Sequence, residues 1–107
     1  MMTDLDRAFE RLAKEFLAQH PEIQHEWRTV KSRWSSDRTD LVCAVGTPNE
    51  VFATLHGHQI AVGPTKGHHD DYEDFGRGHP NEAIAREAFE RFVEVLREYG
   101  HLNAGAR

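Results

Sequence analysis

The chain has 107 residues, of which 38% are hydrophobic and 29% are charged. This length suits one domain, and the composition excludes a wholly disordered chain because it supplies enough apolar side chains for a core. The formal net charge of -5 excludes a general phosphate-binding role, which needs an excess of Lys and Arg. We therefore expect one domain over residues 1–107 that binds no nucleic acid directly.

The chain offers no segment for a membrane or for export. No stretch approaches the ~18 apolar residues of a membrane span, and residues 1–7 lack the basic-then-apolar order of a secretory signal. We expect a cytoplasmic protein without membrane contact. Cys43 is the only cysteine, which excludes an internal disulfide and a cysteine-based zinc cage, and its apolar neighbours favour a buried position.

The first predicted element is an amphipathic helix over residues 3–20. Apolar residues recur there at the spacing of three and four that lines one side of a helix. Thr3 or Asp4 can cap its first amides, and Pro21 ends it. The apolar positions are Leu5, Ala8, Phe9, Leu12, Ala13, Phe16 and Leu17.

Short alternating segments follow and predict an antiparallel sheet. The four predicted strands cover residues 26–35, 39–46, 51–55 and 59–62. The last two are joined by a tight hairpin with Gly57 at a positive φ. Four strands joined by short turns form a meander, which can leave one sheet face open to water.

A loop over residues 63–78 precedes a second amphipathic helix. Pro80 suits the first turn of this helix, and Gly100 is its stop signal. Each helix has only one apolar side, so both must bury it on the sheet or on each other. The expected fold is α+β, in the order α-β-β-β-β-α, with both helices on one face of the sheet. Residues 101–107 are expected to form a frayed tail.

Several histidines raise the question of a metal site. The candidate ligands are His56, His58, His68 and His69, with Asp70 and Asp71 beside them. The first two flank the hairpin glycine and the next two are consecutive, so their side chains need not converge. A solvated turn and loop is the alternative. We expect no cofactor and keep a His-rich metal-binding protein as an alternative function.

An enzymatic role finds no support in the residue pattern. Catalysis needs a nucleophile beside a base, or two carboxylates held in a dry cleft. The serines and threonines follow no nucleophile-elbow motif, and the glycines form no phosphate-binding loop. We therefore expect a non-catalytic protein.

The segment before the last helix is the most distinctive part of the chain, since acids and aromatic rings alternate within it. Carboxylates attract a basic partner over long range, and aromatic rings anchor interfaces. A solvated loop that Phe75 fixes to the core is the alternative. The predicted partner-binding residues are Asp70, Asp71, Tyr72, Glu73, Asp74 and Phe75.

Trp27 is a further candidate for partner binding. It shares one face of the first strand with Thr29, Lys31 and Arg33. If the helices cover the opposite face, an exposed Trp beside basic groups could anchor a partner. The strand could instead have the other orientation, or Trp27 could pack under the first helix.

The small size, the acidic charge, the helix-meander-helix layout and the loop Asp70-Asp71-Tyr72-Glu73-Asp74-Phe75-Gly76 together resemble the small cytoplasmic immunity proteins encoded beside secreted bacterial toxins. The resemblance implies a stoichiometric inhibitor that binds a basic toxin domain without catalysis and shields its active site. The chain is also similar to the acidic secretion chaperones that wrap effectors on a helix-flanked sheet. A homodimer is left open.

Overall fold

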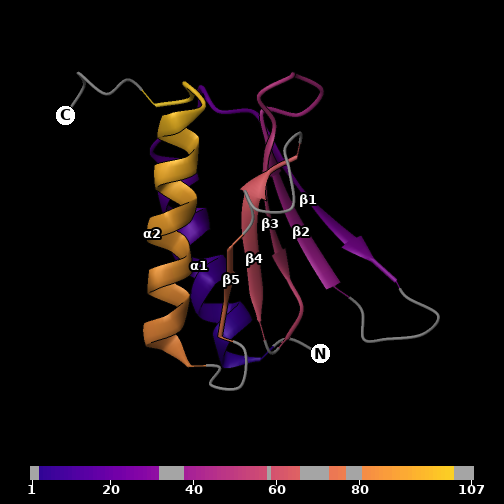
Figure 1. Ribbon diagram of the computed structural model, residues 1–107, viewed down its shortest axis with the longest axis vertical. Helices are drawn as coiled ribbons and strands as arrows, with labels where there is room; N and C mark the ends of the chain where they lie inside the picture. The colour runs from indigo at the N-terminus through magenta and orange to yellow at the C-terminus, as the bar shows by residue number, and fades with distance from the viewer. Residues whose placement is uncertain (1–2, 32–37, 58, 66–72, 77–80, 103–107) are drawn as a thin grey trace.

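The structure is a computed structural model that describes residues 3–31, 38–57, 59–65, 73–76 and 81–102 (Figure 1). Two helices lie on one face of a five-stranded antiparallel sheet, with strand order β1-β2-β3-β4-β5. The elements are α1 (Asp4–Ala18), β1 (His25–Val30), β2 (Arg38–Cys43), β3 (Val51–Leu55), β4 (Ile60–Pro64), β5 (Glu73–Phe75) and α2 (Glu82–Glu98). The predicted α+β layout, with terminal helices and an antiparallel meander, is confirmed.

The fifth strand is an addition to the predicted meander. β5 lies inside the segment predicted to be loop, and it pairs Phe75 with Ile60 and Glu73 with Val62. Three residues with two acids carry no apolar alternation that would mark a strand. The β5 backbone pairs with the side of β4 that faces away from β3.

The strand boundaries differ from the predicted ones mainly at the turns. β2 ends at Cys43 because Ala44 adopts a positive φ of 58°, which no extended strand allows. β1 ends at Val30, and the part of the first predicted strand from residue 32 onward lies outside the described residues. The hairpin prediction at Gly57 is confirmed, since its φ is 94°.

α1 begins at an N-cap that also fixes the β3-β4 hairpin. The Asp6 N–H donates to Thr3 Oγ1 at 3.3 Å, and the Thr3 hydroxyl in turn donates to the Gly57 carbonyl. The cap residue thus joins the first helical turn to a hairpin more than fifty positions along the chain.

The core lies between the two helices and the sheet. Phe9 of α1 and Phe92 of α2 are fully buried, and their ring centroids lie 5.9 Å apart in an edge-to-face arrangement. Both helices begin at the same end of the molecule and run side by side (Figure 1). Cys43 is buried as expected, and burial raises the pKa of its thiol to about 12.

α2 begins and ends with distinct caps. Asn81 is the N-cap and accepts from the Ile84 N–H at 3.1 Å, so the helix starts one residue after Asn81, while Pro80 lies outside the described residues. At the other end, the His101 N–H donates to the Leu96 carbonyl while Gly100 has a φ of 82°.

Of the predicted frayed tail over residues 101–107, the structure describes residues 101–102. Leu102 packs against the core, and a His101 ring nitrogen lies within hydrogen-bonding distance of the Asn49 carbonyl. Residues 103–107 lie outside the described part of the chain. Neither described helix combines the length and the apolar character that crossing a membrane requires.

Candidate functional site

The acidic and aromatic segment falls only partly within the described structure. Asp70, Asp71 and Tyr72 lie outside the described residues. Glu73, Asp74 and Phe75 form β5, an edge strand of the sheet that packs beside α2. The described part of the candidate site is therefore an edge of a sheet next to a helix.

Arg91 of α2 gathers three carboxylates at this edge. Its Nε lies 2.9 Å from Glu73 Oε1, and its Nη1 lies 3.3 Å from Glu94 Oε1 and 3.1 Å from Glu98 Oε2. Burial by itself lowers the pKa of Arg91, but the hydrogen bonds to Glu98 and Glu94 and the charge of Glu73 outweigh it and raise that pKa. One cation against three anions leaves the group with a net negative charge.

Asp74 and Phe75 contribute in opposite ways. Asp74 is exposed, and its carboxylate accepts a 3.5 Å hydrogen bond from Gln59 Nε2. Phe75 is half-buried and packs against the core. This agrees with the alternative interpretation, in which the ring fixes the segment to the domain. The carboxylates therefore face solvent, while the Phe75 ring packs against the core and stabilises the fold.

Trp27 does not project from the open sheet face, so the condition under which it was a candidate partner-binding residue is not met. Trp27 pairs with Leu41, which is fully buried under the helices, and paired residues of an antiparallel ladder project to the same face. Trp27 is half-buried against the core, with Lys14 Nζ 5.6 Å from its ring centroid. The alternative in which it packs with the first helix is the one found. Of its predicted neighbours, Arg33 lies outside the described residues.

Only one of the four candidate metal-binding histidines lies within the described residues. His56 is half-buried at the hairpin, whereas His58, His68 and His69 lie outside the described residues. Among the residues that the structure describes, no group of three or more His, Cys, Asp or Glu side chains could hold a metal ion.

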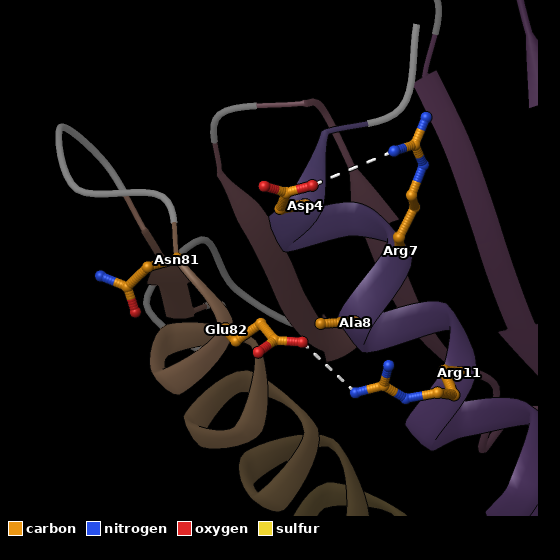
Figure 2. A pocket seen from close by; sticks show the side chains of 6 residues that line it. All are labelled: Asp4, Arg7, Ala8, Arg11, Asn81 and Glu82. Carbon is orange, nitrogen blue, oxygen red and sulfur yellow. Dashed lines mark hydrogen bonds and ion pairs between the residues drawn. The ribbon is translucent and has the colours of Figure 1, made fainter.

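A hollow that the sequence pattern did not reveal lies between the first turns of the helices (Figure 2). Arg11 and Glu82 reach toward each other across it, with Nη2 and Oε1 3.4 Å apart, and Arg7 Nη1 lies 4.0 Å from Asp4 Oδ1. All four side chains are exposed, so these pairs contribute little to stability. Two cations balance two anions here, and the hollow presents no net charge to a ligand. Its lining consists of Asp4, Arg7, Ala8, Arg11, Asn81 and Glu82.

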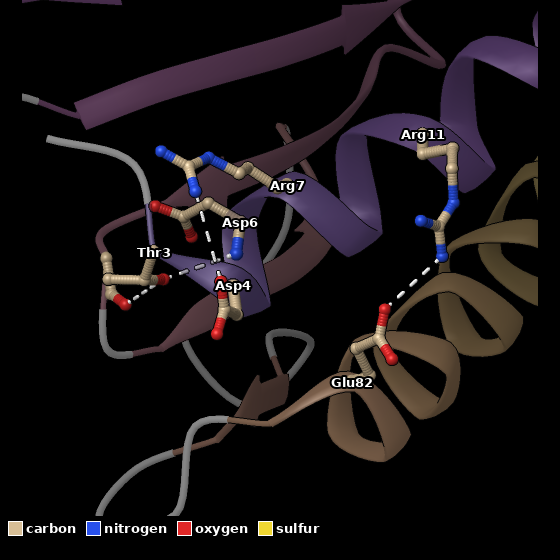
Figure 3. Close-up of polar contacts among 7 residues, drawn as sticks. Thr3, Asp4, Asp6, Arg7, Arg11 and Glu82 are labelled. Atoms are coloured by element: carbon tan, nitrogen blue, oxygen red, sulfur yellow. Dashed lines mark hydrogen bonds and ion pairs between the residues drawn. The ribbon is translucent and has the colours of Figure 1, made fainter.

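Asp6 lies beside Thr3 in the first turn of α1 (Figure 3). It is the one carboxylate that the described structure buries almost completely, with 3% of its surface exposed. Its Oδ1 has no hydrogen-bond partner. Burial raises the pKa of Asp6, against the lowering from backbone hydrogen bonds at Gly57 and Thr3 and from the charge of His56. The Thr3 hydroxyl beside Asp6 accepts from the Asp6 N–H and donates to the Gly57 carbonyl, so these groups belong to the α1-hairpin junction.

Comparison with known proteins finds no match to this chain. No protein-family model matches the chain, and no curated protein or solved structure matches it either.

Proposed function

We propose that the chain is a non-catalytic protein-binding module, most specifically an immunity protein that neutralises a bacterial toxin domain in the cytoplasm. The observation that carries this proposal is the acidic edge, which we define as Glu73, Asp74, Glu94 and Glu98. It combines exposed carboxylates from a strand and a helix at one margin of the sheet.

The acidic edge presents its charge in a fixed arrangement. Arg91 holds one carboxylate of β5 and two of α2, so their side chains lose less freedom on binding than unpaired glutamates would. Asp74 projects to the opposite sheet face from Glu73, because successive strand residues alternate. Negative charge thus lies on both sides of the strand.

Such an edge fits a basic partner. A toxin groove that accepts nucleic-acid phosphates is lined with Lys and Arg, and fixed carboxylates would speed its encounter with this chain and then cover it. The net charge of -5 adds a long-range contribution of the same sign. Binding that blocks the groove requires no catalytic group from the chain.

Charge reversal tests the proposal. We expect Asp74→Lys to slow association with the toxin domain encoded beside the gene of this chain by ~10-fold at low salt and by less at high salt, because screening weakens exposed charges. Glu15→Lys on α1 is the matched control, since it makes the same charge change at an exposed position outside the acidic edge. Stopped-flow association at two salt concentrations gives both rates.

Two outcomes would contradict the proposal. Equal slowing by Asp74→Lys and Glu15→Lys would show that only total charge matters and that the acidic edge is not the binding surface. A genome in which no toxin gene adjoins the gene of this chain would remove the immunity role. Adding Asp70→Lys and Asp71→Lys should slow association further.

A further inference from the structure

β1 is an edge strand with an unbroken ladder on its inner side. It pairs with β2 in continuous register over six residues, from His25 opposite Cys43 to Val30 opposite Arg38. In the described sheet it has a neighbour on one side only, and Figure 1 shows it at the margin farthest from α2. Edge strands of this length are commonly interrupted by a proline or a bulge, and β1 contains neither.

The hydrogen-bond pattern identifies which backbone groups point away from the sheet. The Ala44 N–H donates to the Gln24 carbonyl, so residue 24 bonds inward toward β2. Inward and outward groups alternate along an antiparallel strand. The N–H and C=O groups of His25, Trp27 and Thr29 therefore point outward, toward the open margin.

The side chains between these outward groups carry opposite charges. Glu26 and Arg28 are both exposed and form an ion pair with each other. Because they alternate with Trp27, which lies on the helix-covered face, they project to the face that the helices leave uncovered. They lie one position before and one position after Trp27. This spacing makes the edge complementary to a copy of itself.

We propose that two copies of this chain pair antiparallel along β1 about a two-fold axis at Trp27. In this register Trp27 faces the same residue of the second copy, and His25 faces Thr29, so that every outward N–H and C=O group named above finds a partner. Glu26 of each copy then lies directly opposite Arg28 of the other. The pairing satisfies the backbone and the charges at the same time.

Neighbouring registers do not pair both the outward backbone groups and the opposite charges. An axis at Glu26 sets Glu26 against Glu26, and an axis at Arg28 sets Arg28 against Arg28, and like charges directly opposite each other destabilise a strand pair. With an axis at His25 or Thr29, Glu26 of one copy no longer lies opposite Arg28 of the other. The register at Trp27 is selected by the order Glu-Trp-Arg in the sequence.

The ring of Trp27 adds apolar contact at the axis. It is half-buried against its own core beneath Lys14, which leaves part of the ring to meet the ring of the second copy on the helix-covered face. The acidic edge lies at the other margin of the sheet and stays free in each copy. The test of the dimer is therefore independent of the test of the proposed function. If both proposals hold, the dimer is a bivalent toxin inhibitor.

Charge exchange across the axis tests the pairing. We expect the full chain to form a dimer whose Kd rises at least ~10-fold in Glu26→Arg and in Arg28→Glu, because each change sets two pairs of like charges opposite one another. The double variant Glu26→Arg with Arg28→Glu restores the opposition and should return the Kd close to that of the original chain. Sedimentation equilibrium over a range of concentrations measures all four proteins.

Thr29→Pro provides a test that does not depend on charge. The N–H that it removes points away from β2, so proline at this position leaves the inner ladder intact and blocks only pairing with a second copy. We expect a folded monomer by circular dichroism and sedimentation. A chain that stays monomeric at every concentration, a Kd unchanged in both single variants, or a double variant as weak as the singles would overturn the proposal.

Discussion

At one edge of the sheet β5 pairs over three residues and is tied to α2 through Arg91 and Glu73, whereas at the other edge β1 pairs over six residues with its outward groups open. The first edge, at β5, carries exposed carboxylates, but its strand is only three residues long and has few backbone groups to pair. The second offers backbone and carries a balanced pair of charges, Glu26 and Arg28. The two proposals therefore assign different modes of recognition to the two edges, one electrostatic and one through strand pairing.

The largest expected effect is a loss of stability when the core beneath α2, the helix that packs on β5, is disrupted. Phe92→Ala removes a fully buried ring that packs against Phe9, and we expect it to lower the free energy of unfolding by about 3–5 kcal/mol. Urea denaturation followed by circular dichroism measures the loss. Glu90→Ala, at an exposed position of the same helix, should change stability by less than ~0.5 kcal/mol. Equal effects would mean that α2 is not packed as described.

A smaller effect should follow from changing the end of α2. Gly100 has a φ of 82°, and a Cβ there would meet no atom within 4 Å, so Gly100→Ala costs only the strain of the left-handed conformation. We expect a loss of about 1 kcal/mol, with fraying that reaches Glu98 in the Arg91 cluster. Thermal unfolding measures the loss, and an unchanged midpoint would contradict the cap geometry.

Removing Arg91 separates the electrostatic part of the first edge from its packing. Arg91→Met keeps a long apolar side chain but leaves three carboxylates close together, and we expect a loss of ~1 kcal/mol that shrinks in high salt. Arg86→Met on the exposed side of α2 is the control. A loss that is the same at all salt concentrations would show that packing, rather than charge, joins α2 to β5.

Asp6 provides a comparison away from both edges, with a pH dependence of known sign. Burial raises the pKa of Asp6 in the folded chain above its unfolded value, so its charge destabilises the fold once the pH rises through that window. We expect Asp6→Asn to raise the melting temperature at pH 7 and the gain to disappear as the pH falls below the unfolded pKa. Calorimetry across this range checks it, and a gain that is independent of pH would exclude the titration of Asp6.

The sequence predicts the parts of the fold that local periodicity controls. The stripe of α1, the hairpin at Gly57 and the strand Val51–Leu55 follow from spacing and turn chemistry, and each is found. The fifth strand is different, because Glu73 and its two neighbours form a strand only against the free side of β4. Its existence depends on tertiary contacts that no short window contains.

The candidate site is harder to predict from the sequence than the fold is. Alternation along β1 gives two faces but not which one the helices cover, and both faces carry polar residues, so the direction of Trp27 was undetermined. Arg91 reads as an ordinary surface cation of an amphipathic helix. Only the packing of α2 on β5 brings Glu73 to the same guanidinium as Glu94 and Glu98.

Residue-resolved amide hydrogen exchange along β1 tests the contrast between the two edges most directly. At low protein concentration we predict slow exchange for Glu26, Arg28 and Val30, whose amides bond to β2, and fast exchange for the outward amides of His25, Trp27 and Thr29. At high concentration the outward amides should become protected, while the amide of Asp74 should not change. Uniform protection along β1, or outward amides that exchange equally fast at every concentration, would contradict this account.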